Sequence, residues 1–542
     1  MAAQQTGTRH GGHLALEMAR AYGVTEMFTL SGGHVFPLYD AATAVGLPIY
    51  DVRHEQTAVF AAEGVAKLGR RLGLAVLTAG PGVTNGISAV TTAHFNGSPV
   101  LVFGGRAPNW RWGSGSLQEI DHVPLLAPIT KRAATATSAP QIPAEVGRAA
   151  RAALSGHRGP AFLDFPIDAI FAAADAPVAE PEPTARPEPD PSEVATAAAL
   201  IASAERPVVI AGSDVYADGA WAELAAAAEH LRVPVFANGM GRGCLPADHE
   251  LSFGRARRVA TKGADLVVVV GTPLDFRLSF GEFGAARVVH LVDSPEQRAG
   301  HVKVACSPAG DLGVALSGLA AHTGDRTDHE PWLADLRAAE DAARAADEDA
   351  LDSTAAPIKP SRVYGELRRV LARDAVVVCD GGDFVSYAGK YLDCYTPGCW
   401  LDPGPYGCLG TGQGYAMAAR LTRPDSQVCL LLGDGAAGFS LMDVDSLVRH
   451  RLPVVMVMGN NGIWGLEKHP MRDMYGYDVA ADLQPGLRYD DVVRALGGAG
   501  ETVTDAADIA PALGRAFEAG VPYLVNVLTD PADKYPRSSS LA

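Results

Sequence analysis

The sequence predicts an α/β protein of three domains, each a doubly wound parallel sheet. Short apolar runs such as LAVLTAG, PVVIAG and QVCLLLGDG end at glycine and are followed by helical patterns. Continuous runs of this kind are typical of parallel strands buried on both faces. The 542 residues also exceed what one hydrophobic core usually supports, so about three domains are expected.

The expected strands fall into three groups along the chain. The first group is LAVLTAG (74–80), PVLVFGG (99–105) and AFLDFP (161–166). The second group is PVVIAG (207–212), DLVVVVG (265–271) and RVVHLVD (287–293). The third group is AVVVCDGG (375–382), QVCLLLGDG (427–435) and PVVMVMGNN (453–461). Ligand sites in such sheets are expected beyond the carboxyl ends of the strands.

Two stretches between these groups are expected to be connections. Residues 174–195 are dense in Pro and Glu, and residues 330–362 have the pattern of a charged surface helix followed by an extended segment. The expected parts are therefore an N-terminal domain, a central domain, a C-terminal domain and a short tail, over residues 1–175, 190–325, 358–535 and 536–542.

Composition excludes several classes of protein. The net charge of -17 argues against a nucleic-acid binder. No apolar run reaches the roughly 18 residues of a membrane helix, and the first residues lack the apolar core of a signal peptide. Seven cysteines without a CxxC pair fit neither a zinc site nor a disulfide framework. We therefore expect a cytoplasmic protein without a membrane partner.

The segment from Gly433 to Asn461 carries the strongest chemical signal. A strand ending near Leu432, a crossover helix and the strand PVVMVM would bring Asp434 and Asn461 to one sheet edge. Their oxygen atoms suit Mg²⁺, which also binds phosphate oxygens. Either motif alone is also typical of an ordinary turn. The expected metal ligands are Asp434, Asn461 and the carbonyl of Ile463, and the expected diphosphate contacts are Gly433, Gly435 and Ala436.

With GDG and NN at this spacing, the sequence resembles the thiamine diphosphate enzyme superfamily. Residues 50–90 are similar to the acetolactate synthase-like pattern, with Glu55 at the catalytic position. The resemblance implies that Glu55 protonates the aminopyrimidine ring of the cofactor. It also implies a homodimer or homotetramer, because the superfamily's active sites lie at a subunit interface. A second interpretation of Glu55 is an acid favoured by the helix dipole.

Similarity to the family also places further cofactor contacts. Gly382, Asp383 and Phe384 lie in a segment that resembles the one wrapping the diphosphate. Leu409 occupies the position of the apolar wedge between the two cofactor rings, where relatives commonly have Met. Leu keeps the volume that a wedge needs. Both segments could otherwise be ordinary glycine-rich strand ends.

The central domain resembles the acyl-CoA lyase and decarboxylase version of the family, which implies a possible ADP site. Asp293 ends an expected strand and could bind ribose hydroxyls. A basic cluster could meet the phosphates of coenzyme A, although a solvated charged helix face is the more usual role for most of these residues taken singly. This cluster comprises Arg242, Arg255, Arg257, Arg258 and Lys262.

Substrate contacts are expected in three places. Trp464 and Glu467 follow the NN motif, with Glu467 as a candidate acid or base for a 2-hydroxyl group. His34 and Gln118 occupy positions that face the thiazolium ring in relatives, although a single His or Gln is often just a hydrogen-bonded residue. The tail, with Arg537 and Ser538–Ser540, resembles a lid over the coenzyme A arm, although frayed ends are common.

These expectations converge on a carbon–carbon lyase that cleaves a 2-hydroxyacyl-CoA to a ketone or aldehyde plus formyl-CoA. The resemblance is greatest to lyases for short branched substrates such as 2-hydroxyisobutyryl-CoA. The alternative enzyme is an acetolactate synthase catalytic subunit that acts on pyruvate and contains FAD. The third alternative is a non-catalytic regulatory relative that binds only a nucleotide.

Overall fold

The computed structural model describes residues 9–184 and 186–536. Its three parallel sheets confirm the predicted α/β class. The chain divides into two compact units, which are described separately. Unit 1 comprises Met1–Ala185, Tyr406–Thr422 and Met442–Leu452. Unit 2 comprises Arg186–Pro405, Arg423–Leu441 and Pro453–Ala542.

Unit 1 is built on a 6-stranded sheet in the order β2-β1-β3-β4-β6-β5. Its strands are β1 (Met27–Thr29), β2 (Ile49–Asp51), β3 (Gly73–Leu77), β4 (Val100–Arg106), β5 (Arg132–Thr135) and β6 (Ala161–Pro166). Its helices are α1 (Gly11–Ala21), α2 (Phe36–Val45), α3 (Glu55–Gly69), α4 (Pro81–Asn85), α5 (Ile87–Phe95), α6 (Val123–Leu126), α7 (Ile142–Leu154), α8 (Ile167–Ile170), α17 (Gly412–Thr422) and α19 (Val444–Arg449).

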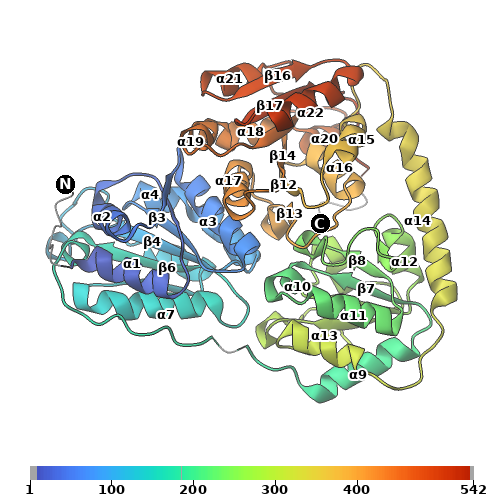
Figure 1. Ribbon diagram of the computed structural model, residues 1–542, viewed down its shortest axis with the longest axis horizontal. Coiled ribbons are helices and arrows are strands. Elements are labelled where there is room, and N and C mark those ends of the chain that lie inside the picture. The colour runs from blue at the N-terminus through green and yellow to red at the C-terminus, as the bar shows by residue number, and fades with distance from the viewer. Residues whose placement is uncertain (1–8, 185, 537–542) are drawn as a thin grey trace. The chain divides into compact units, whose positions relative to one another are not determined.

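Two groups of helices cover this sheet. Helices α1, α2 and α7 share one apolar core, and α1 contacts both of the others (Figure 1). Helix α3 packs against α5 and, far along the chain, against α17. A Cβ atom built at Gly64 would lie 2.6 Å from Ala418 Cβ, so this close helix contact requires glycine.

The first sheet of unit 2 is 5-stranded, in the order β11-β10-β7-β8-β9. Its strands are β7 (Pro207–Ala211), β8 (Val235–Ala237), β9 (Ser252–Phe253), β10 (Leu266–Val270) and β11 (Arg287–Leu291). Its helices are α9 (Pro191–Ser203), α10 (Ser213–Asp218), α11 (Trp221–Leu231), α12 (Arg257–Gly263) and α13 (Leu312–Ala320). The charged helix expected within 330–362 is confirmed as α14 (Glu330–Leu351), the long helix in Figure 1.

The second sheet of unit 2 is 6-stranded, in the order β13-β12-β14-β15-β17-β16. Its strands are β12 (Val376–Asp380), β13 (Trp400–Leu401), β14 (Val428–Gly433), β15 (Val455–Asn460), β16 (Ala499–Val503) and β17 (Tyr523–Leu528). The helices of this part are α15 (Pro360–Val370), α16 (Asp383–Tyr391), α18 (Asp434–Ser440), α20 (Gly465–Tyr475), α21 (Tyr489–Ala495) and α22 (Ile509–Glu518).

The crossover after Asp434 differs from the single helix expected over 440–450. Helix α18 starts at Asp434 itself, a 3₁₀ turn covers Leu441–Asp443, and α19 follows. The interruption places Asp443 at the N-cap position of α19. Among the described helices, none combines the length and the apolar character that crossing a membrane would require.

Candidate functional site

Asp434 and the Asn461 turn lie together at one edge of the second sheet of unit 2. Strands β14 and β15 are neighbours, with Gly433 opposite Gly459. The Asp434 carboxylate accepts hydrogen bonds from the backbone N of Gly462 at 2.8 Å and of Gly435 at 3.1 Å. The parallel topology therefore brings the two motifs together, as the sequence predicts.

The electrostatic state of Asp434 fits a cation site. Its side chain is only 3% exposed, and burial raises its pKa to about 6. Its hydrogen-bond donors in the described part of the chain are neutral backbone amides, so its ionised form lacks a full countercharge there. A hard divalent ion would supply that charge. The side-chain oxygen of Asn461 accepts a hydrogen bond from Ile463 N at 3.2 Å. This bond fixes the turn that carries Asn461 and Ile463, the two predicted metal ligands besides Asp434.

The glycines of this edge have different structural roles. A Cβ at Gly435 would lie 2.6 Å from the ring of Trp464, whereas a Cβ at Gly433 would meet nothing within 4 Å. Gly435 therefore makes room for Trp464, and Gly433 leaves open space beside Asp434. We predict that a diphosphate approaches at Gly433, with the Ala436 amide at the start of α18 as a donor. The Gly435 amide, the other predicted donor, is bonded to the Asp434 carboxylate.

The predicted diphosphate segment lies at the same edge. Phe384 packs on Gly459 of β15, so closely that a Cβ at Gly459 would collide with its ring. Gly382 is covered by Leu466, and the Asp383 carboxylate lies against Gly465. The structure thus brings Gly382, Asp383 and Phe384 next to residues on both sides of Asn461.

A cavity of about 750 Å³ opens beside this turn and is lined by Asn461, Gly462, Ile463 and the cations Lys468, Arg472 and Lys534. All three cations pair with carboxylates, as Lys534 does with Asp473 at 2.8 Å. Glu467 lies in the first turn of α20, is exposed and is not among the cavity-lining residues. Its catalytic role stays a prediction.

Glu55 is the first residue of α3 in unit 1 and is 7% exposed. Asn85 Nδ2 donates a hydrogen bond to its Oε2 at 3.0 Å. Asp443 fixes the chain on both sides of it, because Oδ1 accepts from Arg53 N at 2.7 Å and Oδ2 accepts from Thr57 Oγ1 at 2.7 Å. The sequence reasoning missed Asn85 and Asp443, since each depends on a contact between distant segments.

His34 and Gln118 lie in one loop cluster of unit 1. His34 Nδ1 is 3.4 Å from Thr78 Oγ1, and burial lowers the pKa of His34, which keeps it neutral at pH 7. Gln118 has a φ of +61°, unusual for a residue with a side chain. It sits over Gly80, where an added Cβ would lie 2.8 Å from Gln118 Cβ.

A buried polar network holds Gly80 beneath Gln118. The backbone N of Gly80 donates to His122 Nε2 at 3.0 Å, which leaves Nδ1 to donate to Asp164 at 2.9 Å. Arg106 and Thr135 also donate to Asp164, at 3.0 and 2.6 Å. This network fixes the His122 tautomer. None of its members could be predicted from the sequence, because the network joins segments that are far apart along the chain.

Leu409 and Asp293 are the two remaining predicted cofactor contacts. Leu409 belongs to unit 1, is partly exposed and stands just before α17. Asp293 is buried two residues beyond the end of β11, at the carboxyl edge of the central sheet. Their cofactor roles stay predictions.

A second cavity, of about 450 Å³, lies within unit 2 and is rich in cations. Arg242, Arg255 and Arg257 of the predicted basic cluster line it, together with Arg344 and Lys390. The other two predicted members, Arg258 and Lys262, are exposed on α12 and do not line it. Tyr535 and Pro536 also line this cavity. Arg537 and Ser538–Ser540, the predicted lid contacts, lie outside the described residues.

Comparison with known protein families decides the class of this site. Residues 9–125 match the N-terminal TPP binding domain of thiamine pyrophosphate enzymes, residues 194–319 match their central domain, and residues 380–527 match their C-terminal TPP binding domain. The chain belongs to the thiamine pyrophosphate enzyme family. The predicted resemblance is thereby confirmed, and thiamine diphosphate, the predicted cofactor, is the one that this family's domains bind.

The names of similar proteins describe two different activities, acetolactate synthase and 2-hydroxyacyl-CoA lyase. An acetolactate synthase large subunit of Mycobacterium tuberculosis is 52% identical over 99% of this chain and 98% of its own length. A 2-hydroxyacyl-CoA lyase 2 of Caenorhabditis elegans is 36% identical, over 97% of this chain and 90% of its own. The human 2-hydroxyacyl-CoA lyase 2 is 33% identical, over 92% and 85%. These identities favour the alternative, synthase, over the predicted lyase.

Proposed function

We propose that this thiamine diphosphate enzyme cleaves a 2-hydroxyacyl-CoA to a ketone or aldehyde plus formyl-CoA, with 2-hydroxyisobutyryl-CoA as the first substrate to test. The structural support for a coenzyme A substrate is the cationic cavity of unit 2, which suits a ligand that carries phosphates. Coenzyme A carries a 3′-phosphate and a diphosphate, and arginine is well suited to bind such groups.

Arg257 is the most informative residue of that cavity. Burial and the neighbouring cations Arg242 and Arg277 lower its pKa to about 10, and within residues 9–184 and 186–536 no carboxylate counteracts them. A largely buried cation without a countercharge is costly unless a ligand supplies the charge. Two other cavity cations are neutralised by carboxylates, Arg344 by Asp393 at 3.0 Å and Lys390 by Asp347 at 2.6 Å.

The remaining site residues fit this chemistry. Thiamine diphosphate, when bound, supplies an electron sink for carbon–carbon scission. We propose that Asp434, Asn461 and Ile463 bind it through Mg²⁺ and that Glu55 exchanges a proton with its aminopyrimidine ring. His34 and Gln118 would orient the reacting carbonyl and hydroxyl groups. ADP at Asp293 has no further observation behind it and remains a proposal from the resemblance.

The second candidate is condensation of pyruvate to acetolactate. Its support is the 52% identity to a protein named as an acetolactate synthase, and by sequence similarity alone it is the stronger of the two. The diphosphate of FAD would also complement the cationic cavity. The cavity therefore supports a phosphorylated ligand, and only the reaction distinguishes the two activities.

One comparison of substrates tests both candidates. The purified enzyme with thiamine diphosphate and Mg²⁺ is incubated with a series of 2-hydroxyacyl-CoA esters and, in parallel, with pyruvate with and without FAD. Formyl-CoA from the esters supports the lyase. Acetolactate from pyruvate without formyl-CoA overturns it in favour of the synthase. Nucleotide binding without either product supports the regulatory alternative.

Adjacent arginines provide a matched pair of variants. Arg257→Gln removes the cavity cation, and Arg258→Gln removes an exposed charge on the same helix. We expect Arg257→Gln to raise KM for the coenzyme A ester at least tenfold, since a desolvated charge–phosphate contact is worth about 1.5–3 kcal/mol. Arg258→Gln should change KM by less than about twofold. Equal effects in both variants contradict the assignment of the cavity.

We also propose a homodimer or homotetramer, as the resemblance implies. Sedimentation velocity of the enzyme loaded with thiamine diphosphate measures the assembly. A purely monomeric species that is fully active contradicts this proposal.

A further inference from the structure

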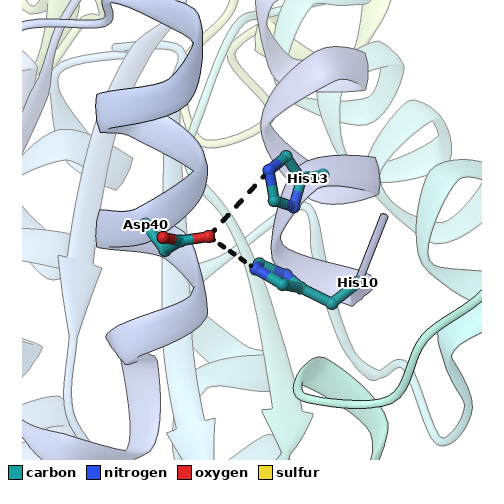
Figure 2. Close-up of side chains that lie close together, drawn as sticks. All are labelled: His10, His13 and Asp40. Atoms are coloured by element: carbon teal, nitrogen blue, oxygen red, sulfur yellow. Dashed lines mark hydrogen bonds and ion pairs between the residues drawn. The ribbon is translucent and has the colours of Figure 1, made fainter. Parts of the chain in front are cut away.

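Three potential metal ligands meet on the surface of unit 1, and none of them is among the residues assigned above. His10 precedes α1, His13 lies in its first turn, and Asp40 projects from the facing helix α2 (Figure 2). Asp40 Oδ2 is 3.0 Å from His10 Nε2 and 4.0 Å from His13 Nε2. One ligand atom from each residue lies within 4.8 Å of the others.

The sequence HGGH explains why these side chains face each other. A Cβ at Gly12 would collide with the carbonyl of Pro37, and one at Gly11 would lie 2.6 Å from Ile142 Cδ1. Glycine at both positions therefore lets α1 lie against its neighbours. Because Asp40 is one turn beyond Pro37, it faces the two histidines that flank the glycines (Figure 2).

The separations suit a four-coordinate ion. Ligand atoms bound at about 2.0–2.1 Å in a tetrahedron lie roughly 3.3 Å apart, between the two separations from Asp40. The carboxylate is 65% exposed and each histidine 19%, so small side-chain rotations can close the site and solvent can supply a fourth ligand. Two imidazoles and a carboxylate favour Zn²⁺, Co²⁺ or Ni²⁺ over Mg²⁺.

The protonation states are compatible with such an ion. Burial and His10 lower the pKa of His13, which favours the neutral imidazole that a metal binds. Its Nδ1 has no hydrogen-bond partner in the described part of the chain, so no bond at Nδ1 fixes the tautomer and Nε2 is free to carry the lone pair. His10 Nδ1 accepts from Gly12 N at 3.2 Å. Metal binding at its Nε2 would move the proton to Nδ1 and break this capping bond, which weakens the ion's affinity by roughly 2- to 30-fold.

We propose that His10, His13 and Asp40 form a binding site for a borderline divalent cation such as Zn²⁺. The ion would link the start of α1 to α2 and so stabilise unit 1. The site is independent of the thiamine diphosphate residues and of the reaction proposed above.

Metal stoichiometry tests the proposal without any activity assay. Full-length protein without a histidine tag is treated with chelator, reloaded with thiamine diphosphate and excess Mg²⁺, and titrated with ZnCl₂ by calorimetry. We expect His13→Ala and Asp40→Asn each to bind one Zn²⁺ fewer than the unchanged protein. With Co²⁺ as the probe, both variants should lose visible d–d absorption, and Zn²⁺ should raise the melting temperature only of the unchanged protein.

His249→Ala is the matched control, because His249 pairs with Glu229 at 3.0 Å and belongs to no group of three metal-ligating side chains among the described residues. It should bind as much Zn²⁺ as the unchanged protein. Asp40→Asn alters an exposed side chain and keeps its size, so it should fold normally even if His13→Ala does not. Equal stoichiometry in Asp40→Asn and the unchanged protein would overturn the proposal, as would loss of the ion in His249→Ala alone.

Discussion

Asp443 Oδ2 accepts a hydrogen bond from Thr57 Oγ1 at 2.7 Å, although the two residues are 386 positions apart in the chain. The other oxygen of Asp443 accepts from Arg53 N. Glu55 lies between these two contacts and begins α3. The position of Glu55 therefore depends on the Asp443 carboxylate, which belongs to a distant segment of the chain.

We expect Asp443→Ala to misplace Glu55 as well as to destabilise unit 1. Two buried donors, Thr57 Oγ1 and Ser446 Oγ, and the part-buried Arg53 N lose their acceptor, and each buried donor left without an acceptor costs about 1–3 kcal/mol in the free energy of unfolding. Exchange of the C2 proton of bound thiamine diphosphate, followed by NMR below the melting temperature, should slow at least tenfold. Asp445→Ala is the control, because Asp445 makes only partly exposed ion pairs, worth about 1 kcal/mol or less. Unchanged exchange in a folded Asp443→Ala protein would rule out the positioning role.

Glu55→Gln should remove proton transfer but keep the fold. The amide has nearly the same shape and can still accept from Asn85 Nδ2, yet it cannot exchange a proton. We expect C2 proton exchange to fall by about 10²–10⁴-fold, the usual contribution of a general acid or base, while thiamine diphosphate still binds. Exchange at the original rate would mean that another residue carries this step.

The two glycines of the GDG motif should respond differently to alanine. Gly435→Ala places a methyl group against Trp464 and should destabilise the fold by about 1–3 kcal/mol. Gly433→Ala meets no atom within 4 Å and should leave the unfolding free energy within about 0.5 kcal/mol. It should nevertheless weaken thiamine diphosphate binding, measured by calorimetry, if the diphosphate occupies that space. Normal affinity in Gly433→Ala would place the diphosphate elsewhere.

Magnesium affinity should depend on pH through Asp434. Burial raises the pKa of this carboxyl to about 6, so it is ionised above that pH and protonated below it. A cation competes with the proton, so Mg²⁺ affinity should be constant above about pH 7 and fall toward roughly tenfold per pH unit below pH 6. Without metal, the effect of pH on the free energy of unfolding has the opposite sign. The stabilising contribution of Asp434 is present at low pH and is lost as pH rises through 6. Asp434→Asn should abolish both dependences in titrations from pH 5 to 8.

The long apolar strands could be predicted because burial on both faces leaves a continuous apolar run. Strands β3, β10 and β14 each lie within such a run. Short strands such as β9 and β13, two residues each, leave no comparable pattern. They form because a neighbouring strand supplies hydrogen bonds, which is a property of the tertiary structure.

The candidate site likewise has residues that a sequence pattern predicts and residues that only tertiary packing brings together. Asp434 and Asn461 could be placed together because they end parallel strands that are close in sequence. Arg344 and Lys390 join the cationic cavity from helices α14 and α16, and only the packing of unit 2 brings them to Arg257. The left-handed backbone of Gln118 likewise depends on Gly80 beneath it and has no signature in the residues around position 118.

The composition of unit 1 has a practical consequence for dissecting this protein. Helices α17 and α19 are encoded more than two hundred residues downstream of the sheet they accompany, so no single cut of the gene separates a complete unit from the remainder. A fragment ending near residue 185 would expose the surface of α3 that Ala418 and Tyr415 normally cover. Such a fragment should aggregate when expressed alone, and adding the missing helices through a short linker is the direct way to recover a soluble half.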